Sequence, residues 1–212
     1  MKRDLLSVSN LRREEIEQLV ERALRMKQEK TPFLLSGKTL ALLFEKPSLR
    51  TRVSFDIAMY QLGGHAIYLS PEEVGLGKRE PIPDVARVLS RYVDGIAART
   101  FSQETLRILA EYSSVPVINA LSDVEHPCQA LSDLLTIYEK KSKLSGLTLA
   151  FIGDGNNVAN SLLLAASLTG MNFRIASPPS YEIKKEILSQ GREFAASNGG
   201  QILLTNQPHE AA

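Results

Sequence analysis

Residues 39–52 read TLALLFEKPSLRTR, an apolar run that changes at Pro47 and Ser48 into a helical stretch. The run at 39–44 is too short for a typical helix and predicts a strand that is buried on both faces. Gly63 and Gly64 follow the helical stretch and are suited to ending a helix. A buried strand that leads directly into a helix is the repeating unit of an α/β fold.

The same alternation continues on either side of this unit. Helical periodicity precedes it, and apolar runs alternate with helical patterns after it. Short connections between strands and helices predict parallel sheets with helices on both faces, the doubly wound α/β class. The further strands are expected at 66–69, 95–98, 115–120, 147–152, 172–176 and near 202–204.

A lysine-rich turn at residues 140–143 is the best candidate for a domain boundary. We therefore predict a complete first domain at 1–142 and a second domain at 143–212. The second domain has only three predicted strands, which is few for a doubly wound sheet. It is expected to be truncated, so that a complete protein would continue beyond residue 212.

Bulk composition excludes several classes of partner. The 212 residues carry a formal net charge of +1, which argues against nucleic acid or a membrane surface as a partner. The single cysteine rules out an intrachain disulfide, and no Cys/His group has the spacing of a zinc site, so no metal is expected. Neither a signal peptide nor a membrane-length apolar run is found, which indicates a cytoplasmic protein.

Polar side chains follow the first strand where the next helix begins. Unpaired backbone N–H groups at a helix N-terminus favour an anion, and Ser48 and Thr51 add hydroxyl donors. Arg50 can bind phosphate oxygens with two parallel hydrogen bonds. This pattern predicts a phosphate site; the alternative is an ordinary N-cap with solvated arginines.

Two other segments follow strands in the same way. Arg99 follows the strand at 95–98, and His126 and Gln129 open the helix after the strand at 115–120. Taken singly, each residue has an ordinary interpretation: Arg99 as a surface arginine and His126 as a helix cap. Cys128 is interpreted as a buried thiol and not as a nucleophile. Because parallel strands place their carboxyl ends at one edge, the groups together fit a small molecule with a phosphate and a carbonyl.

Residues 153–157, GDGNN, only partly match a dinucleotide-binding motif. Val158 stands where the third glycine would be, and the strand at 172–176 does not end in an acidic residue. We therefore interpret the segment as a tight turn that presents Asn157 to a ligand.

Four motifs in this order resemble the ornithine and aspartate carbamoyltransferase family. They are FEKPSLRTRVSF at 44–55, ARTF at 98–101, HPCQALSDLLTIY at 126–138 and FIGDGNN at 151–157. Cys128 within HPCQ and the pair Asn156-Asn157 are similar to the branch that uses ornithine as the acceptor. Putrescine, modified ornithine and aspartate stay open as alternative acceptors.

The resemblance implies a role for each matching residue. Phosphate is expected to contact Ser48, Arg50, Thr51 and the backbone N–H of Leu49. The carbonyl oxygen is expected to contact Arg99, which also reaches the phosphate, and His126. The remaining two residues are Gln129 for the carbamoyl amino group and Asn157 for ornithine.

The implied reaction transfers the carbamoyl group of carbamoyl phosphate to the δ-amine of L-ornithine and gives citrulline and phosphate. Arg99, Thr51 and His126 are expected to stabilise the oxyanion, and neither a cofactor nor a metal is needed. The resemblance also implies a homotrimer or a multiple of trimers, with the loop at 73–80 reaching a neighbouring subunit. Relatives carry further ornithine-binding loops, so the activity of 212 residues alone is doubtful. The alternative is a truncated, non-catalytic relative that binds carbamoyl phosphate.

Overall fold

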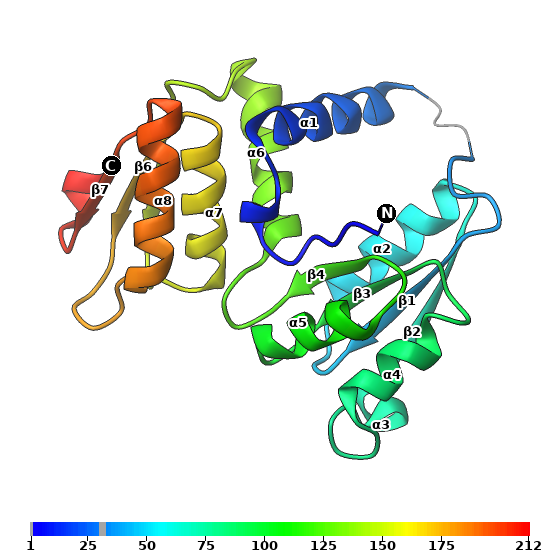
Figure 1. Cartoon of the computed structure of the whole chain (residues 1–212). Helices are drawn as coiled ribbons and strands as arrows, with labels where there is room; N and C mark the ends of the chain where they lie inside the picture. The colour runs from blue at the N-terminus through cyan, green and yellow to red at the C-terminus, as the bar shows by residue number, and fades with distance from the viewer. Residues whose placement is uncertain (1, 30–32) are drawn as a thin grey trace. The chain divides into compact units, whose positions relative to one another are not determined.

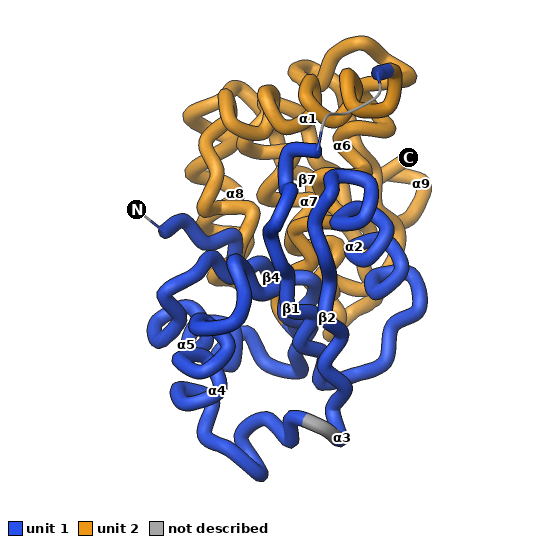
Figure 2. The backbone as a smooth tube through the Cα atoms, turned by 90° about the vertical axis from the view of Figure 1, so that its right-hand side faces the viewer, with its two compact units in different colours: residues 1–6, 29–123 blue, residues 7–28, 124–212 orange. Residues whose placement is uncertain are grey.

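The protein forms two compact units, which are coloured separately in Figure 2 and described one at a time below. The computed structural model describes residues 2–29 and 33–212. The first unit comprises Met1–Leu6 and Glu29–Asp123, and the second comprises Ser7–Gln28 and Val124–Ala212.

The first unit is built on a parallel four-stranded sheet with the strand order β2-β1-β3-β4. The central strand β1 is almost wholly buried because it has a neighbouring strand on each edge and helices on each face. The strands are β1 (Thr39–Phe44), β2 (His65–Leu69), β3 (Gly95–Arg99) and β4 (Val117–Leu121). The helices are α2 (Leu49–Gln61), α3 (Pro71–Val74), α4 (Ile82–Leu89) and α5 (Gln103–Tyr112).

Alternate residues of β1 serve the two faces of this sheet. Leu40, Leu42 and Phe44 belong to a core that α2 covers. Ala41 and Leu43 point the other way, into a second core that includes residues of α4 and α5. Both faces are therefore covered, as a doubly wound sheet requires.

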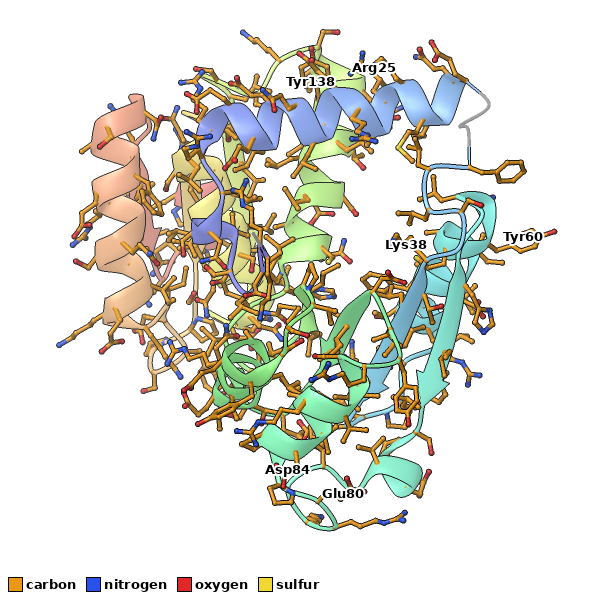
Figure 3. All side chains as sticks on the ribbon, turned by 45° about the vertical axis from the view of Figure 1, so that its right-hand side comes forward. Arg25, Lys38, Tyr60, Glu80, Asp84 and Tyr138 are labelled. Carbon is orange, nitrogen blue, oxygen red and sulfur yellow. The ribbon has the colours of Figure 1, made fainter. Side chains whose placement is uncertain are left out.

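The helix α2 is bound to its face of the sheet along one side only. Met59 is buried against the sheet, whereas Ile57 and Tyr60 are exposed. Figure 3 shows Tyr60 extending from α2 away from the ribbon. The apolar inner side fixes the axis of α2, and this in turn fixes where its N-terminus lies.

The second unit combines a parallel three-stranded sheet, in the order β5-β6-β7, with a group of helices. Its core surrounds α7, whose residues 159–168 are all buried (Figure 1). The strands are β5 (Thr148–Ile152), β6 (Asn172–Ala176) and β7 (Ile202–Thr205). The helices are η1 (Val8–Asn10), α1 (Arg13–Gln28), α6 (Pro127–Lys141), α7 (Asn157–Leu168), α8 (Lys185–Asn198) and α9 (Pro208–Ala211).

The predicted α/β class with parallel sheets is confirmed, and the two sheets differ in how they are covered. In the second sheet the strand order runs in one direction, so right-handed crossovers place α7 and α8 on the same face. Leu149 and Phe151 of β5 pack into the core, while Ile152 is 58% exposed. The second sheet is therefore covered by long helices on one face within the described residues.

The division into domains 1–142 and 143–212 stays a prediction. By packing, α1 and α6 belong with the residues that follow, because Ile16, Val20 and Leu134 share one core with α7. Within the described ranges, no helix is long and apolar enough to cross a membrane.

Candidate active site

The N-terminus of α2 has the local structure that the sequence predicts. Ser48 is the N-cap, and its Oγ accepts a hydrogen bond from the Thr51 backbone N–H and donates one to Thr51 Oγ1 at 2.9 Å. The side chain of Leu49 is 80% exposed, which leaves only its backbone for a ligand contact. Arg50 is exposed and forms no ion pair with the described residues. Free N–H groups, two hydroxyls and an unpaired guanidinium therefore gather at one helix end.

The register of the first sheet places Arg99 next to the end of β1, the strand that leads into α2. Phe44 and Arg99 are paired residues of β1 and β3, and the Glu45 N–H donates to the Arg99 carbonyl oxygen at 2.8 Å. Arg99 Nε is buried and finds no hydrogen-bond partner among residues 2–29 and 33–212. Burial lowers the pKa of the Arg99 guanidinium, because the charged form has lost solvation. An anion bound here would offset that cost.

Neighbouring charged residues hold the loops of this sheet edge. Glu45 accepts a hydrogen bond from the Phe101 N–H at 2.8 Å, and Lys46 lies over the Phe101 ring. Arg52 lies over the Tyr68 ring at 3.8 Å. Of the two arginines in this turn of α2, Arg52 is thus engaged within the protein and Arg50 is the one available for a ligand.

In the second unit, His126 occupies the N-cap position of α6 without a side-chain capping bond. The simple alternative, a histidine that caps its own helix, is therefore not what the structure has. The His126 backbone N–H donates to Ser161 Oγ at 2.9 Å, and Pro127 follows at the first helical position. The imidazole is thereby attached to a backbone that α7 holds in place.

Cys128 and Gln129 occupy the first turn of α6 and differ in their chemistry. Burial raises the pKa of the Cys128 thiol to about 11, so the thiolate is scarce at neutral pH, which argues against a nucleophilic role. Gln129 is exposed, and its Nε2 donates to Asp133 Oδ1 at 2.9 Å. The amide oxygen of Gln129 is therefore the end left for a ligand.

The GDGNN segment forms the predicted tight turn and separates the roles of its two asparagines. Asn156 is the N-cap of α7, and its Oδ1 accepts from the backbone N–H groups of Val158 and Ala159. Asn157 is the first residue of the helix. Asn156 is thus accounted for by capping, which leaves Asn157 as the candidate for ligand contact.

The segment after α3 is a compact turn and not an extended loop. Gly77 N–H donates to the Glu80 carbonyl oxygen, and Arg79 N–H donates to the Gly75 carbonyl oxygen. Gly75 has a φ of +55°, a conformation that favours glycine, and an added Cβ would lie 2.8 Å from Arg79 Cβ. Lys78 and Arg79 are exposed on this turn.

Sequence reasoning missed Glu125, a carboxylate that is 3% exposed next to His126. Its Oε2 accepts hydrogen bonds from the Val8 N–H and from Ser161 Oγ, each at 3.0 Å. Since Ser161 also receives the His126 N–H, one hydroxyl joins the carboxylate to the backbone of the histidine. A glutamate before a histidine carries no periodic signal, so only the fold reveals its burial.

Glu125→Gln should change how stability depends on pH. Burial raises the pKa of Glu125 above its ordinary value of 4.5, against the lowering effect of hydrogen bonds from Ser7, Val8 and Ser161. When the pKa of a carboxyl is higher in the folded state than in the unfolded state, the protein becomes less stable as the pH rises above the unfolded-state pKa. The free energy of unfolding of the variant, minus that of the native protein, should therefore increase as the pH rises above the ordinary value of 4.5.

Urea unfolding at several pH values measures this difference. Glu193→Gln, at an exposed position in the middle of α8, is the matched control. If the free energy of unfolding of Glu125→Gln runs parallel to that of the native protein over the whole pH range, the Glu125 carboxylate is not desolvated.

No group of three or more His, Cys, Asp or Glu side chains in the described part of the chain could hold a metal ion.

Two family models match nearly the whole chain. Residues 3–139 match the carbamoyl-phosphate-binding domain of aspartate/ornithine carbamoyltransferase, and residues 145–212 match the Asp/Orn-binding domain. The chain belongs to the aspartate/ornithine carbamoyltransferase family. The two models meet between residues 139 and 145, next to the lysine-rich turn at the end of α6.

Individual members of the carbamoyltransferase family agree with this assignment. The ornithine carbamoyltransferase of Anoxybacillus flavithermus is 52% identical over 99% of this chain and 68% of its own length. That of Picrophilus torridus is 48% identical over the whole chain and 70% of its own. The structure of ornithine carbamoyltransferase from Pyrococcus furiosus matches with a TM-score of 0.96 at 46% identity, over 99% of this chain and 68% of that one.

Proposed function

We propose that the protein transfers the carbamoyl group of carbamoyl phosphate to the δ-amine of L-ornithine, giving citrulline and phosphate. The observation that carries the proposal is Arg99, whose buried Nε has no hydrogen-bond partner among the described residues and which the sheet register pairs with Phe44 at the end of β1, the strand that leads into α2. Relatives named ornithine carbamoyltransferase, with 48–52% sequence identity to this chain, support ornithine as the acceptor.

Each residue receives a role from its chemistry within its own unit. The helix end with Ser48, the Leu49 backbone, Arg50 and Thr51 binds phosphate and stabilises its departure as a leaving group. Arg99 contacts the phosphate and the carbonyl oxygen.

In the second unit, His126 donates a hydrogen bond to the carbonyl oxygen, and the amide oxygen of Gln129 accepts one from the carbamoyl amino group. Asn157 contacts the amino-acid end of ornithine.

The reaction follows from these contacts without a metal or an organic cofactor. The neutral δ-amine attacks the carbonyl carbon, and the negative charge that develops on its oxygen is stabilised by Arg99, Thr51 and His126. Collapse of the tetrahedral intermediate expels phosphate, and the departing phosphate takes up the proton that the amine loses. Positioning and preorganised charge supply the catalysis. A cytoplasmic location belongs to the same proposal.

A citrulline assay tests the proposal directly. Carbamoyl phosphate is supplied with L-ornithine, putrescine or L-aspartate as the acceptor, and the carbamoylated product is identified by mass. Because the chain spans 68% of the length of the Anoxybacillus relative, a fusion that adds the unmatched part of that relative is assayed in parallel. We expect ornithine to give the highest turnover. Faster carbamoylation of putrescine or aspartate would contradict the acceptor assignment.

The protein should sediment as a trimer or a multiple of trimers. The proposed subunit contact is the turn that carries the exposed cations Lys78 and Arg79, which would extend to a neighbouring subunit. Sedimentation equilibrium at several concentrations should return about three times the chain mass of 23.4 kDa, or a multiple of this value. A mass that stays at that of one chain would contradict both the trimer and the proposed contact between subunits.

A further inference from the structure

We infer that Asp133 determines which end of the Gln129 amide faces the ligand, and that it thereby selects a carbamoyl group over an acetyl group. The inference rests on the proposed function, because it concerns how the proposed site recognises the carbamoyl end of its substrate. Asp133 is a positioning residue here, since it acts through Gln129.

The geometry of α6 fixes the orientation of the amide. Gln129 and Asp133 are four residues apart on one helix, and Gln129 Nε2 lies 2.9 Å from Asp133 Oδ1. An ionised carboxylate can only accept hydrogen bonds, so it must face the NH2 end of the amide. The oxygen Oε1 of Gln129 is then the end of the amide that remains available to a ligand. Within the described ranges, the Gln129 side chain makes no other hydrogen bond.

The Asp133 carboxylate costs the fold more free energy than an ordinary surface residue on a helix does. Asp133 is half-buried, and burial raises its pKa, against the lowering effect of the Gln129 amide. No cation pairs with it in the part of the chain that the structure describes. A glutamine–aspartate pair on a helix surface stabilises the helix only weakly, and this gain does not offset the free-energy cost of a partly desolvated charge. Orienting the Gln129 amide is a function that would explain why Asp133 is at this position.

The orientation matters because the two ligands differ only next to the carbonyl. Carbamoyl phosphate has an NH2 group where acetyl phosphate has a methyl group, and both end in the same phosphate. An outward Oε1 accepts an N–H from the carbamoyl group and gains nothing from a methyl group. A reversed amide would set its own N–H groups against those of the ligand, so the preference would disappear.

Titration calorimetry with freshly dissolved carbamoyl phosphate and acetyl phosphate measures the preference as a ratio of two affinities. Effects on the phosphate end or on the folded fraction cancel in this ratio. The native protein should favour carbamoyl phosphate by about tenfold. Asp133→Lys presents only donors, so it should turn Gln129 around and bring the ratio to about one. Asp133→Asn, which accepts either orientation, should lie in between.

Thr136→Lys is the control for a new cation on α6, because Thr136 is exposed one turn further along the same helix. It should keep the native ratio. An unchanged ratio in Asp133→Lys, in a protein that prefers carbamoyl phosphate, would overturn the inference alone. A native protein that binds carbamoyl phosphate no better than inorganic phosphate would overturn the proposed function, and this inference with it.

Discussion

Arg99→Ala should reduce the affinity for carbamoyl phosphate at least about a hundredfold without lowering the melting temperature of the ligand-free protein. A guanidinium that forms two charge-assisted hydrogen bonds contributes on the order of 3–6 kcal/mol at about 1.5–3 kcal/mol for each bond. In the free protein, Arg99 Nε has no partner among the described residues, and burial lowers the guanidinium pKa. Removing an uncompensated cation costs the fold little, because its desolvation is also removed.

Calorimetric titration and thermal unfolding of the same preparations measure the two effects. Arg107→Ala is the matched control, since Arg107 is an exposed arginine of α5 whose side chain lies 3.4 Å from Glu104. It should change neither quantity by much. Arg99→Lys keeps the charge but loses the planar fork, so its affinity should fall between those of the native protein and Arg99→Ala. Full affinity in Arg99→Ala would remove this residue from the site.

Local sequence patterns predicted those parts of the fold that depend on neighbouring residues. The strand β1 begins and ends at the predicted residues because an apolar run enclosed by polar residues marks its own limits. Pro47 and Ser48 likewise predicted the start of α2, since capping is a contact within four residues. The strand β4 begins at Val117, two residues after its predicted start, because Pro116 just before it has no N–H to donate.

Features that depend on distant residues were not predictable in this way. The burial of Glu125 depends on Val8 and Ser161, which are far from it in the chain. At the candidate site, the sequence predicted Arg50 as the phosphate ligand, but it did not predict what Arg52 contacts. That contact depends on Tyr68 of β2, which supplies the ring over which Arg52 lies.

Gly155→Ala should destabilise the second unit by about 3 kcal/mol, although the sequence indicates only a tight turn at this position. An added Cβ would lie 2.4 Å from Ile183 N and 2.5 Å from Glu182 C, and both are backbone atoms that cannot rotate away. The Gly155 N–H also donates to the Tyr181 carbonyl oxygen at 2.6 Å. The turn before α7 thus packs directly on the backbone of the segment before α8.

Separating these two backbones also moves the N-cap of α7, because Asn156 follows Gly155 directly and bonds the Val158 N–H. The lost cap accounts for about 1 kcal/mol of the total destabilisation of about 3 kcal/mol. Thermal unfolding followed by circular dichroism should show a melting temperature lower by roughly 6–12 °C. Gly146→Ala is the control: its φ is +76° but nothing lies within 4 Å of an added Cβ, so only backbone strain of about 1 kcal/mol remains. Equal losses in the two variants would mean that glycine is needed at 155 for its conformation and not for the close approach to the segment before α8.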